Sequence, residues 1–215
     1  MRILCLNANT TAYVTRTVAD EMASTLCNRA HVIPVTPEDG PPIIRSAEDN
    51  ALAHQGVLTA AHEHMNNADA IMLAVSFDTA LTELRGSLSI PVVGMTEASI
   101  SLARLCGGPL GFITLGASLV PLYEETLTHC DLKTDCVGWR AFDAPSAYRE
   151  GDKTELDRLL LAATAELATD GARTVVLLGA VLAGAARRIA PRTKTRVIDG
   201  GNAGALIAEA LLNLP

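Results

Sequence analysis

The sequence of 215 residues is acidic, with a formal net charge of −7 at pH 7, and 49% of it is hydrophobic. Such a chain offers no broad basic surface for a phosphate backbone, so nucleic acid is excluded as an expected partner. No apolar run reaches the roughly 20 residues that cross a bilayer, because glycine, proline or charged residues interrupt the longest ones. The five cysteines show no CxxC spacing, which favours a reduced, cytoplasmic location.

The first part of the chain predicts alternating strands and helices. Residues 2–6 form a short apolar run, and an amphipathic stretch over residues 14–26 predicts a helix after it. Residues 30–35 predict a second strand. The cluster Gly40-Pro41-Pro42 marks a loop, which we expect to act as a flap over a cleft, before a helix that begins near Ser46.

The remaining elements continue the same alternation. Strands are expected over residues 70–75, 90–94, 110–114, 174–178 and 195–200. Helices are expected over residues 51–67, 81–88, 97–105, 120–130, 156–168 and 203–212, and residues 137–151 are expected to be mainly loop. Alternating strands and helices are typical of βαβ units with parallel sheets.

The sequence also indicates an internal duplication. The strand that ends before Ser76 and the strand that ends before Gly179-Ala180 are each followed at a similar distance by another short apolar strand. We therefore predict an α/β fold of two pseudo-symmetric lobes, with parallel sheets flanked by helices and a cleft between them. Residues 1–97 and 198–215 would form the first lobe and residues 98–197 the second. Ser76 and Ala180 would face each other across the cleft, because ligands bind beyond the carboxyl ends of such strands.

Three polar strand ends are candidate parts of a site. In Asn7-Ala8-Asn9-Thr10-Thr11, side-chain amides, hydroxyls and the N–H groups of a helix start could hold a carboxylate or an oxyanion, although Asn and Thr are also ordinary helix caps. Ser76-Phe77-Asp78-Thr79 places a hydroxyl beside a carboxylate, either to orient a substrate or to cap a helix. Thr114 ends the strand of the second half that corresponds to residues 2–6, so we expect it to contact a ligand.

Other classes of site are not indicated. Glu97 stands near a helix start, where it either interacts with the helix dipole or lines the cleft. His62-Glu63-His64 puts two histidines on opposite sides of a helix, so no metal site is expected. Residues 200–204 lack the order of a dinucleotide fingerprint, and no cofactor is expected.

Four segments together resemble the aspartate/glutamate/hydantoin racemase superfamily, most closely its hydantoin and allantoin racemase branch. They are Asn7-Ala8-Asn9-Thr10-Thr11, Ser76-Phe77-Asp78-Thr79, residues 91–98 and residues 178–184. The resemblance implies two opposed cysteines, one removing the proton next to a carbonyl and the other returning it, with no cofactor and in a homo-oligomer. Related members use a single cysteine for decarboxylation or for isomerising a double bond. The substrate-binding positions that follow are Asn7, Asn9, Thr10, Phe77, Thr79, Glu97, Thr114, Gly179 and Val181.

The chain departs from this pattern at the two positions expected to be cysteine, which are Ser76 and Ala180. A serine hydroxyl is too weak an acid to act as a thiolate does near pH 7, and alanine carries no transferable proton. The substitutions are either an engineered change or a natural branch, and their smooth fit with neighbouring residues favours the natural branch. Such a branch would use Asp78, Glu97 or a bound water as base.

The predicted function is a cofactor-independent isomerase that acts at or next to the carbon α to a carbonyl of a small cyclic amide or carboxylate. The catalytic candidates are Ser76, Ala180 and Asp78. The alternatives are a diverged hydrolase or lyase that cleaves a C–N or C–C bond in the same cleft, and an inactive variant that only binds its ligand.

Overall fold

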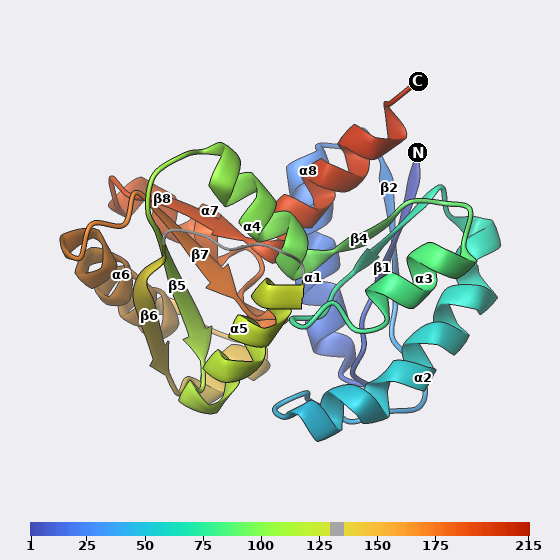
Figure 1. Cartoon of the computed structure of the whole chain (residues 1–215), viewed down its shortest axis with the longest axis horizontal. Helices are drawn as coiled ribbons and strands as arrows, with labels where there is room; N and C mark the ends of the chain where they lie inside the picture. Colours follow the sequence, from blue (N-terminus) through green and yellow to red (C-terminus); the bar gives the residue numbers. More distant parts are fainter. Residues whose placement is uncertain (130–135) are drawn as a thin grey trace.

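The computed structural model describes residues 1–129 and 136–215 and contains two four-stranded parallel sheets (Figure 1). The strand order is β2-β1-β3-β4 in the first sheet and β6-β5-β7-β8 in the second, so the same order occurs twice. The strands are β1 (Arg2–Leu6), β2 (His31–Val35), β3 (Ala70–Leu73), β4 (Val92–Gly94), β5 (Leu110–Leu115), β6 (Cys136–Phe142), β7 (Thr174–Leu178) and β8 (Arg196–Asp199). The predicted α/β fold with two similar parallel sheets is confirmed.

The helices cover both faces of each sheet. They are α1 (Ala12–Leu26), α2 (Ala47–His64), α3 (Leu81–Ser87), α4 (Met95–Leu105), α5 (Val120–His129), α6 (Thr154–Thr169), α7 (Ala185–Ile189) and α8 (Gly200–Leu212). Helix α2 begins as the sequence predicts, because the Ser46 side chain accepts a hydrogen bond from the Asp49 N–H at 3.1 Å. None of the helices described combines the length and apolarity needed to cross a membrane.

Helices α1, α4 and α8 lie between the two sheets, while α2, α3 and α6 lie outside (Figure 1). Helix α8 follows the second sheet in the chain but contacts β3 and β4 of the first, and α4 follows the first sheet but contacts β7 and β8 of the second. Helices α4 and α8 also pack against each other. Their close approach requires glycine, because a Cβ at Gly200 would lie 2.4 Å from the Met95 Cγ.

Strand β6 corrects one prediction, since residues 137–151 were expected to be mainly loop. Its residues Cys136–Phe142 form an edge strand beside β5, with a register irregularity between Leu110 and Gly111. Trp139 stacks on Phe112 with ring centroids 4.7 Å apart, and Arg140 forms ion pairs with Glu166 and Asp170. The strand is half-buried and carries a glycine and an arginine, so its sequence lacks the apolar run that marks the central strands.

Candidate functional site

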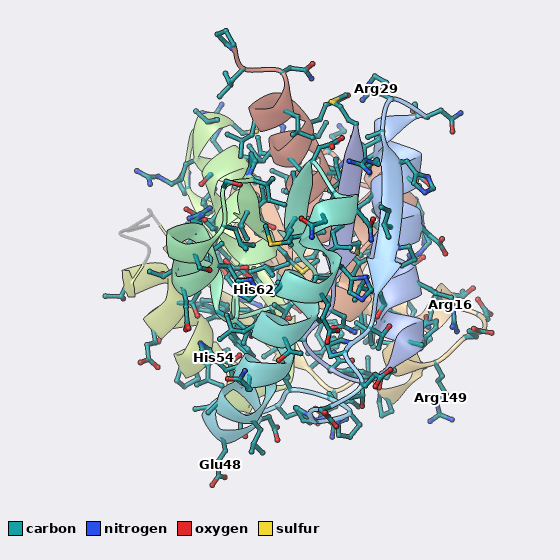
Figure 2. All side chains as sticks on the ribbon, turned by 90° about the vertical axis from the view of Figure 1, so that its right-hand side faces the viewer. Arg16, Arg29, Glu48, His54, His62 and Arg149 are labelled. Atoms are coloured by element: carbon teal, nitrogen blue, oxygen red, sulfur yellow. The ribbon has the colours of Figure 1, made fainter. Side chains whose placement is uncertain are left out.

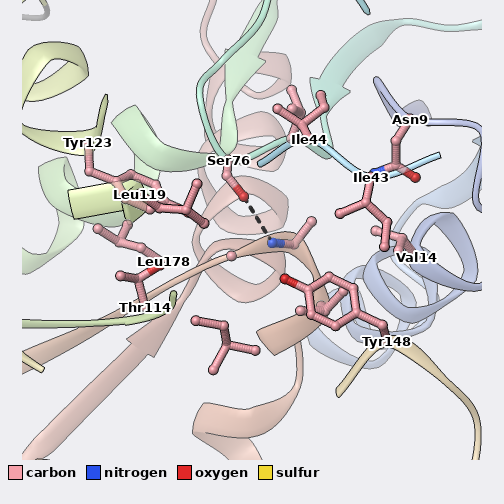
Figure 3. A pocket seen from close by; sticks show the side chains of 15 residues that line it. Asn9, Val14, Ile43, Ile44, Ser76, Thr114, Leu119, Tyr123, Tyr148 and Leu178 are labelled. Carbon is pink, nitrogen blue, oxygen red and sulfur yellow. Dashed lines mark hydrogen bonds between the residues drawn. The ribbon is translucent and has the colours of Figure 1, made fainter. Parts of the chain in front are cut away.

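A small cavity lies at the carboxyl ends of the central strands, in the seam between the two sheets (Figure 3). Its volume is about 40 Å³, and we call it the central cavity. Six of the predicted site residues line it, together with apolar and aromatic side chains from both halves of the chain. The six are Asn9, Ser76, Thr114, Gly179, Ala180 and Val181.

Ser76 and Ala180, 104 positions apart in the sequence, lie side by side in the central cavity. Ser76 belongs to the turn after β3, and Ala180 begins the short helical turn after β7. The Ala180 N–H donates a hydrogen bond to the Ser76 Oγ at 3.2 Å, as Figure 3 shows. The corresponding strand ends of the two halves therefore meet at one point, which is the arrangement that the internal duplication predicts.

Two buried hydroxyls in the cavity lack protein partners. The Thr114 Oγ1 and the Tyr123 hydroxyl are both buried, and neither forms a hydrogen bond within the described residues. Burial raises the pKa of Tyr123, while the nearby side chains of Ser76 and Thr114 act in the opposite direction. Because buried polar groups are almost always hydrogen-bonded, these hydroxyls mark a position for a water molecule or for a polar ligand group.

Asn9 supplies a further donor. Its Oδ1 accepts hydrogen bonds from the Asn7 Nδ2 at 3.0 Å and from the Thr11 N–H at 3.0 Å. With the oxygen thus engaged, the Nδ2 group of Asn9 is the part of the side chain available to a ligand. Figure 3 shows Asn9 on the side of the cavity opposite Thr114 and Tyr123.

Removing either unpartnered hydroxyl is expected to raise the stability of the protein and to weaken ligand binding. In Thr114→Val or Tyr123→Phe, the free protein loses a buried polar group without a partner, so its free energy of unfolding should rise by up to about 1 kcal/mol. Ligand affinity should fall about tenfold, because a donor to the ligand is lost. Urea denaturation and calorimetric titration with a cyclic amide measure the two effects. A loss of stability with unchanged affinity would contradict the assigned role of these hydroxyls.

Asp78 is buried beside the cavity but faces the start of helix α4. Its carboxylate accepts hydrogen bonds from the Thr96 N–H at 3.0 Å and the Glu97 N–H at 2.8 Å. The Thr96 hydroxyl in turn donates to the Ser76 carbonyl at 2.5 Å. Asp78 adopts a left-handed backbone conformation, with φ of 49°. These contacts fasten the Ser76 turn to α4, so Asp78 positions the turn and does not line the central cavity.

The Asp78 carboxyl is expected to give folding stability a recognisable pH dependence. Burial raises its pKa from 3.8 to about 7, against the lowering effect of the Thr96 and Glu97 N–H groups. Between these values the folded protein binds a proton that the unfolded chain releases, so this group makes the free energy of unfolding fall as pH rises from about 4 to about 7. In Asp78→Asn this fall should be absent, and urea denaturation at several pH values measures it.

The matched control for this experiment is Asp152→Asn. The pKa of Asp152 is lowered by hydrogen bonds from the Thr154 hydroxyl and N–H at the exposed start of α6. Its effect on stability therefore has the opposite sign, being present at higher pH and lost as pH falls. Parallel pH profiles for the unsubstituted protein and Asp78→Asn would show that Asp78 is not the titrating group.

The other predicted site residues lie outside the central cavity lining. Asn7 is buried and donates to Thr15 Oγ1 at 3.0 Å, which fixes the turn after β1. The Thr10 N–H donates to the Pro41 carbonyl at 3.1 Å. Phe77 packs against Tyr123 with ring centroids 4.8 Å apart. The Thr79 hydroxyl donates to Asn50 Oδ1, and Glu97 pairs with Arg85 at 2.7 Å. Thr10 contributes through its backbone N–H, and the other four residues contribute through their side chains.

Two loops close over the cavity and contribute residues that the sequence did not reveal. Ile43 and Ile44 come from the loop after β2, and Tyr148 comes from the corresponding loop after β6. The Arg45 guanidinium lies over the Tyr148 ring, 5.5 Å from its centroid, so the loops touch each other. The two loops follow β2 and β6, which occupy equivalent places in the two sheets. The internal duplication is therefore the signal that would have predicted the second loop.

The second loop is also tied to helix α1. Arg16 of α1 forms an ion pair with Glu150 at 2.9 Å, and Figure 2 shows Arg16 beside the segment that carries Arg149. Lys153 lies over the Tyr13 ring, 5.3 Å from its centroid. These exposed contacts are weak individually, so they add little to the stability of the second loop.

No described cysteine lines the central cavity. Cys5 is buried in β1, where burial raises the pKa of its thiol, and Cys27, Cys106 and Cys136 are exposed elsewhere. Cys130 lies outside the described residues. The cavity polar groups are therefore hydroxyls and amides.

A family model described as Asp/Glu/hydantoin racemase matches residues 3–208. The chain belongs to the Asp/Glu/hydantoin racemase family. It is 29% identical over 214 residues to a hydantoin racemase of Rhizobium meliloti, with 99% of this chain and 89% of that protein covered. The allantoin racemase of Pseudomonas fluorescens gives a TM-score of 0.86 at 28% identity, with 99% and 91% of the two chains covered.

A second solved structure, the allantoin racemase of Klebsiella pneumoniae, gives a TM-score of 0.91 at 23% identity and covers 99% of this chain and 87% of that one. The similarity to the racemase family that the strand-end motifs predict is thus confirmed. Membership of the Asp/Glu/hydantoin racemase family makes the chain an enzyme of the isomerase class that acts on a small molecule.

Proposed function

We propose that this member of the racemase family acts, without a cofactor, at the carbon next to a carbonyl of a small cyclic amide. The observation that carries the proposal is the neutrality of the central cavity, whose described lining contains no Lys, Arg, His, Asp or Glu. A buried carboxylate substrate would need a compensating positive charge. A cyclic amide presents only N–H and C=O groups, which Asn9, Thr114 and Tyr123 can pair with.

The proposed chemistry places the carbonyl oxygen of the substrate against the unpartnered donors. When the α C–H bond breaks, its electron pair moves into an enolate whose oxygen becomes negative. The hydroxyls of Thr114 and Tyr123 are buried and free of other hydrogen bonds in the described residues, and one such donor contributes about 3 kcal/mol in comparable oxyanion sites. Stabilisation of the enolate is therefore the main contribution of this site to catalysis.

The proton itself is transferred less efficiently in this chain than a two-thiol site would allow. We place Ser76 and Ala180 at the positions of the two thiols that the resemblance implies. A hydroxyl and a methyl group supply neither a thiolate nor a thiol. In the proposed reaction the proton therefore passes to water and returns from water to either face of the enolate.

Proton exchange in deuterated water tests the proposal. Hydantoin, allantoin and related cyclic amides are incubated with the protein, and loss of the α-proton signal is followed by NMR together with optical rotation. Exchange above the uncatalysed rate with the ring intact supports the proposal, and Tyr123→Phe serves as the matched control with one donor removed. Ring opening or loss of a fragment would instead indicate a hydrolase or lyase, and binding without exchange would indicate a protein that only binds its ligand.

A further inference from the structure

A second, larger cavity is lined by residues of α2, α3 and α5 and of the turn that follows β3. Its volume is about 330 Å³, which falls within the roughly 300 to 1,000 Å³ of ordinary ligand pockets. None of its described lining residues also lines the central cavity. We call it the acidic cavity, and the residues that decide its chemistry are Phe77, Asp78, Leu81, Leu122 and Glu125.

Part of this lining is apolar. Leu81 of α3 and Leu122 of α5 contribute aliphatic side chains, and Phe77 contributes its ring. Phe77 also packs against Tyr123, with ring centroids 4.8 Å apart, and Tyr123 lines the central cavity. Phe77 therefore connects the linings of the two cavities. The acidic cavity can bury the hydrocarbon part of a ligand against these three side chains.

The charges of the acidic cavity are all negative. Asp78 and Glu125 line it, and its described lining contains no Lys, Arg or His. Asp78 is only 6% exposed, yet it forms no ion pair with any residue that the structure describes. The nearby Arg85 guanidinium is already paired with Glu97 at 2.7 Å. Because buried charges are normally paired, the cavity lacks a positive group.

The Asp78 carboxylate keeps acceptor capacity for such a group. Its two oxygens accept one hydrogen bond each, from the Thr96 N–H at 3.0 Å and the Glu97 N–H at 2.8 Å, whereas a carboxylate has about four acceptor positions. An ammonium group offers three N–H donors together with a positive charge. A neutral hydroxyl would supply a hydrogen bond without the charge, and a carboxylate would be repelled by Asp78 and Glu125.

We propose that the acidic cavity is a binding site for a small organic ammonium ion, whose hydrocarbon part packs on Phe77, Leu81 and Leu122. The ammonium group donates to the free acceptor positions of Asp78, and the exposed carboxylate of Glu125 adds a weaker attraction. The site does not depend on the proposed function, because it shares no described lining residue with the central cavity.

Three aromatic compounds of nearly equal size test this inference. Benzylammonium is positively charged, benzyl alcohol is neutral and benzoate is negatively charged. Dissociation constants are measured by calorimetric titration at pH 8. We expect benzylammonium to bind about tenfold more tightly than benzyl alcohol, and benzoate to bind more weakly than both. Equal affinities for benzylammonium and benzyl alcohol, or no binding of benzylammonium, would overturn the proposal.

Substitutions in the lining locate the bound ion. Thr82→Trp places a large ring at an exposed position of the lining, so the protein should stay folded and lose the binding. Glu125→Gln should weaken benzylammonium about threefold and leave benzyl alcohol unchanged. Glu124→Gln, at an exposed position of α5 outside the described lining, is the matched control and should change neither affinity. Undiminished binding in a folded Thr82→Trp variant would place the ion elsewhere and contradict the assignment.

The affinity for benzylammonium should also rise with pH. Burial raises the pKa of Asp78 to about 7; the Glu97 charge acts in the same direction, while the Thr96 and Glu97 N–H groups and the Arg85 charge oppose it. Between pH 6 and pH 8 the ionised fraction of Asp78 increases about tenfold, so the affinity should increase about tenfold as well. Asp78→Asn should remove this dependence. A flat pH profile for the unsubstituted protein, or the same rise in Asp78→Asn, would show that Asp78 does not hold the ammonium group.

Discussion

Introducing thiols at both faces of the central cavity, by Ser76→Cys together with Ala180→Cys, is expected to accelerate α-proton exchange of a cyclic amide by about 100-fold or more. A thiol with a pKa near 8.5 is partly ionised close to neutral pH, whereas a serine hydroxyl is not. The Ala180 N–H already donates to the Ser76 Oγ at 3.2 Å, so it would also stabilise a thiolate at position 76. Both side chains border the same cavity, which puts the two new groups on one ligand.

The single variant Ser76→Cys separates the contributions of the two thiols to this exchange rate. With Ser76→Cys alone, one enantiomer should exchange its α-proton for deuterium with little inversion, because only one face has a proton carrier. With both changes, NMR should show exchange and optical rotation should fall to zero. Cys106→Ser, at an exposed position outside the cavity lining, is the control and should change nothing. A folded double variant that is no faster than the unsubstituted protein would refute the assignment of these positions.

Asp199→Ala is expected to lower the free energy of unfolding by about 3 kcal/mol. This buried carboxylate accepts hydrogen bonds from the Gly184 and Ala186 N–H groups, at 3.0 and 3.1 Å, and from the Asn202 N–H at 3.1 Å. It thereby joins the loop after β7 to the start of α8, and alanine would leave three N–H groups without their acceptor. Burial raises the pKa of Asp199 to about 6, against these hydrogen bonds.

Urea denaturation at about pH 8 measures this loss. The matched control is Asp69→Ala, because Asp69 forms an exposed ion pair with Arg2 at 2.9 Å and its loss should lower stability far less. Equal losses for the two substitutions would show that Asp199 does not hold the loop in place.

Asp78 and Asp199 perform matching tasks in the two halves of the chain. Each ties the loop after the third strand of a sheet to the helix that follows the fourth strand. The carboxylate comes from the loop in the first half and from the end of β8 in the second. Both halves of the chain therefore keep a carboxylate link between this loop and this helix, but the aspartate that makes the link stands at a different position in each half.

The sequence predicted the parts of this molecule that depend on local pattern. Apolar runs marked the central strands, and the repeat of polar or glycine residues after β3 and β7 predicted that Ser76 and Ala180 share a site. Strand β6 was missed because edge strands tolerate glycine and charge. The cavity roles of Tyr123 and Tyr148 depend on how α5 and the loop after β6 pack on the other half, which no local pattern encodes.

Some expectations remain predictions. They are the division into residues 1–97 with 198–215 and residues 98–197, the homo-oligomeric state and the cytoplasmic location. For Asp78 and Glu97, the sequence left a choice between catalysis and helix capping. The hydrogen bonds of Asp78 and the Arg85 ion pair of Glu97 favour structural roles for both.

The crossing of α4 and α8 between the sheets has a consequence for how such a protein can arise. A polypeptide made of one repeat alone would carry its last helix toward a sheet that it does not possess, and the strands of its own sheet that the other repeat's helix covers would be exposed. Two copies could satisfy each other only by exchanging these helices, as intertwined dimers do. An ancestor of half this length would therefore have folded as an obligate dimer, and the tandem pair joins the two copies in one chain.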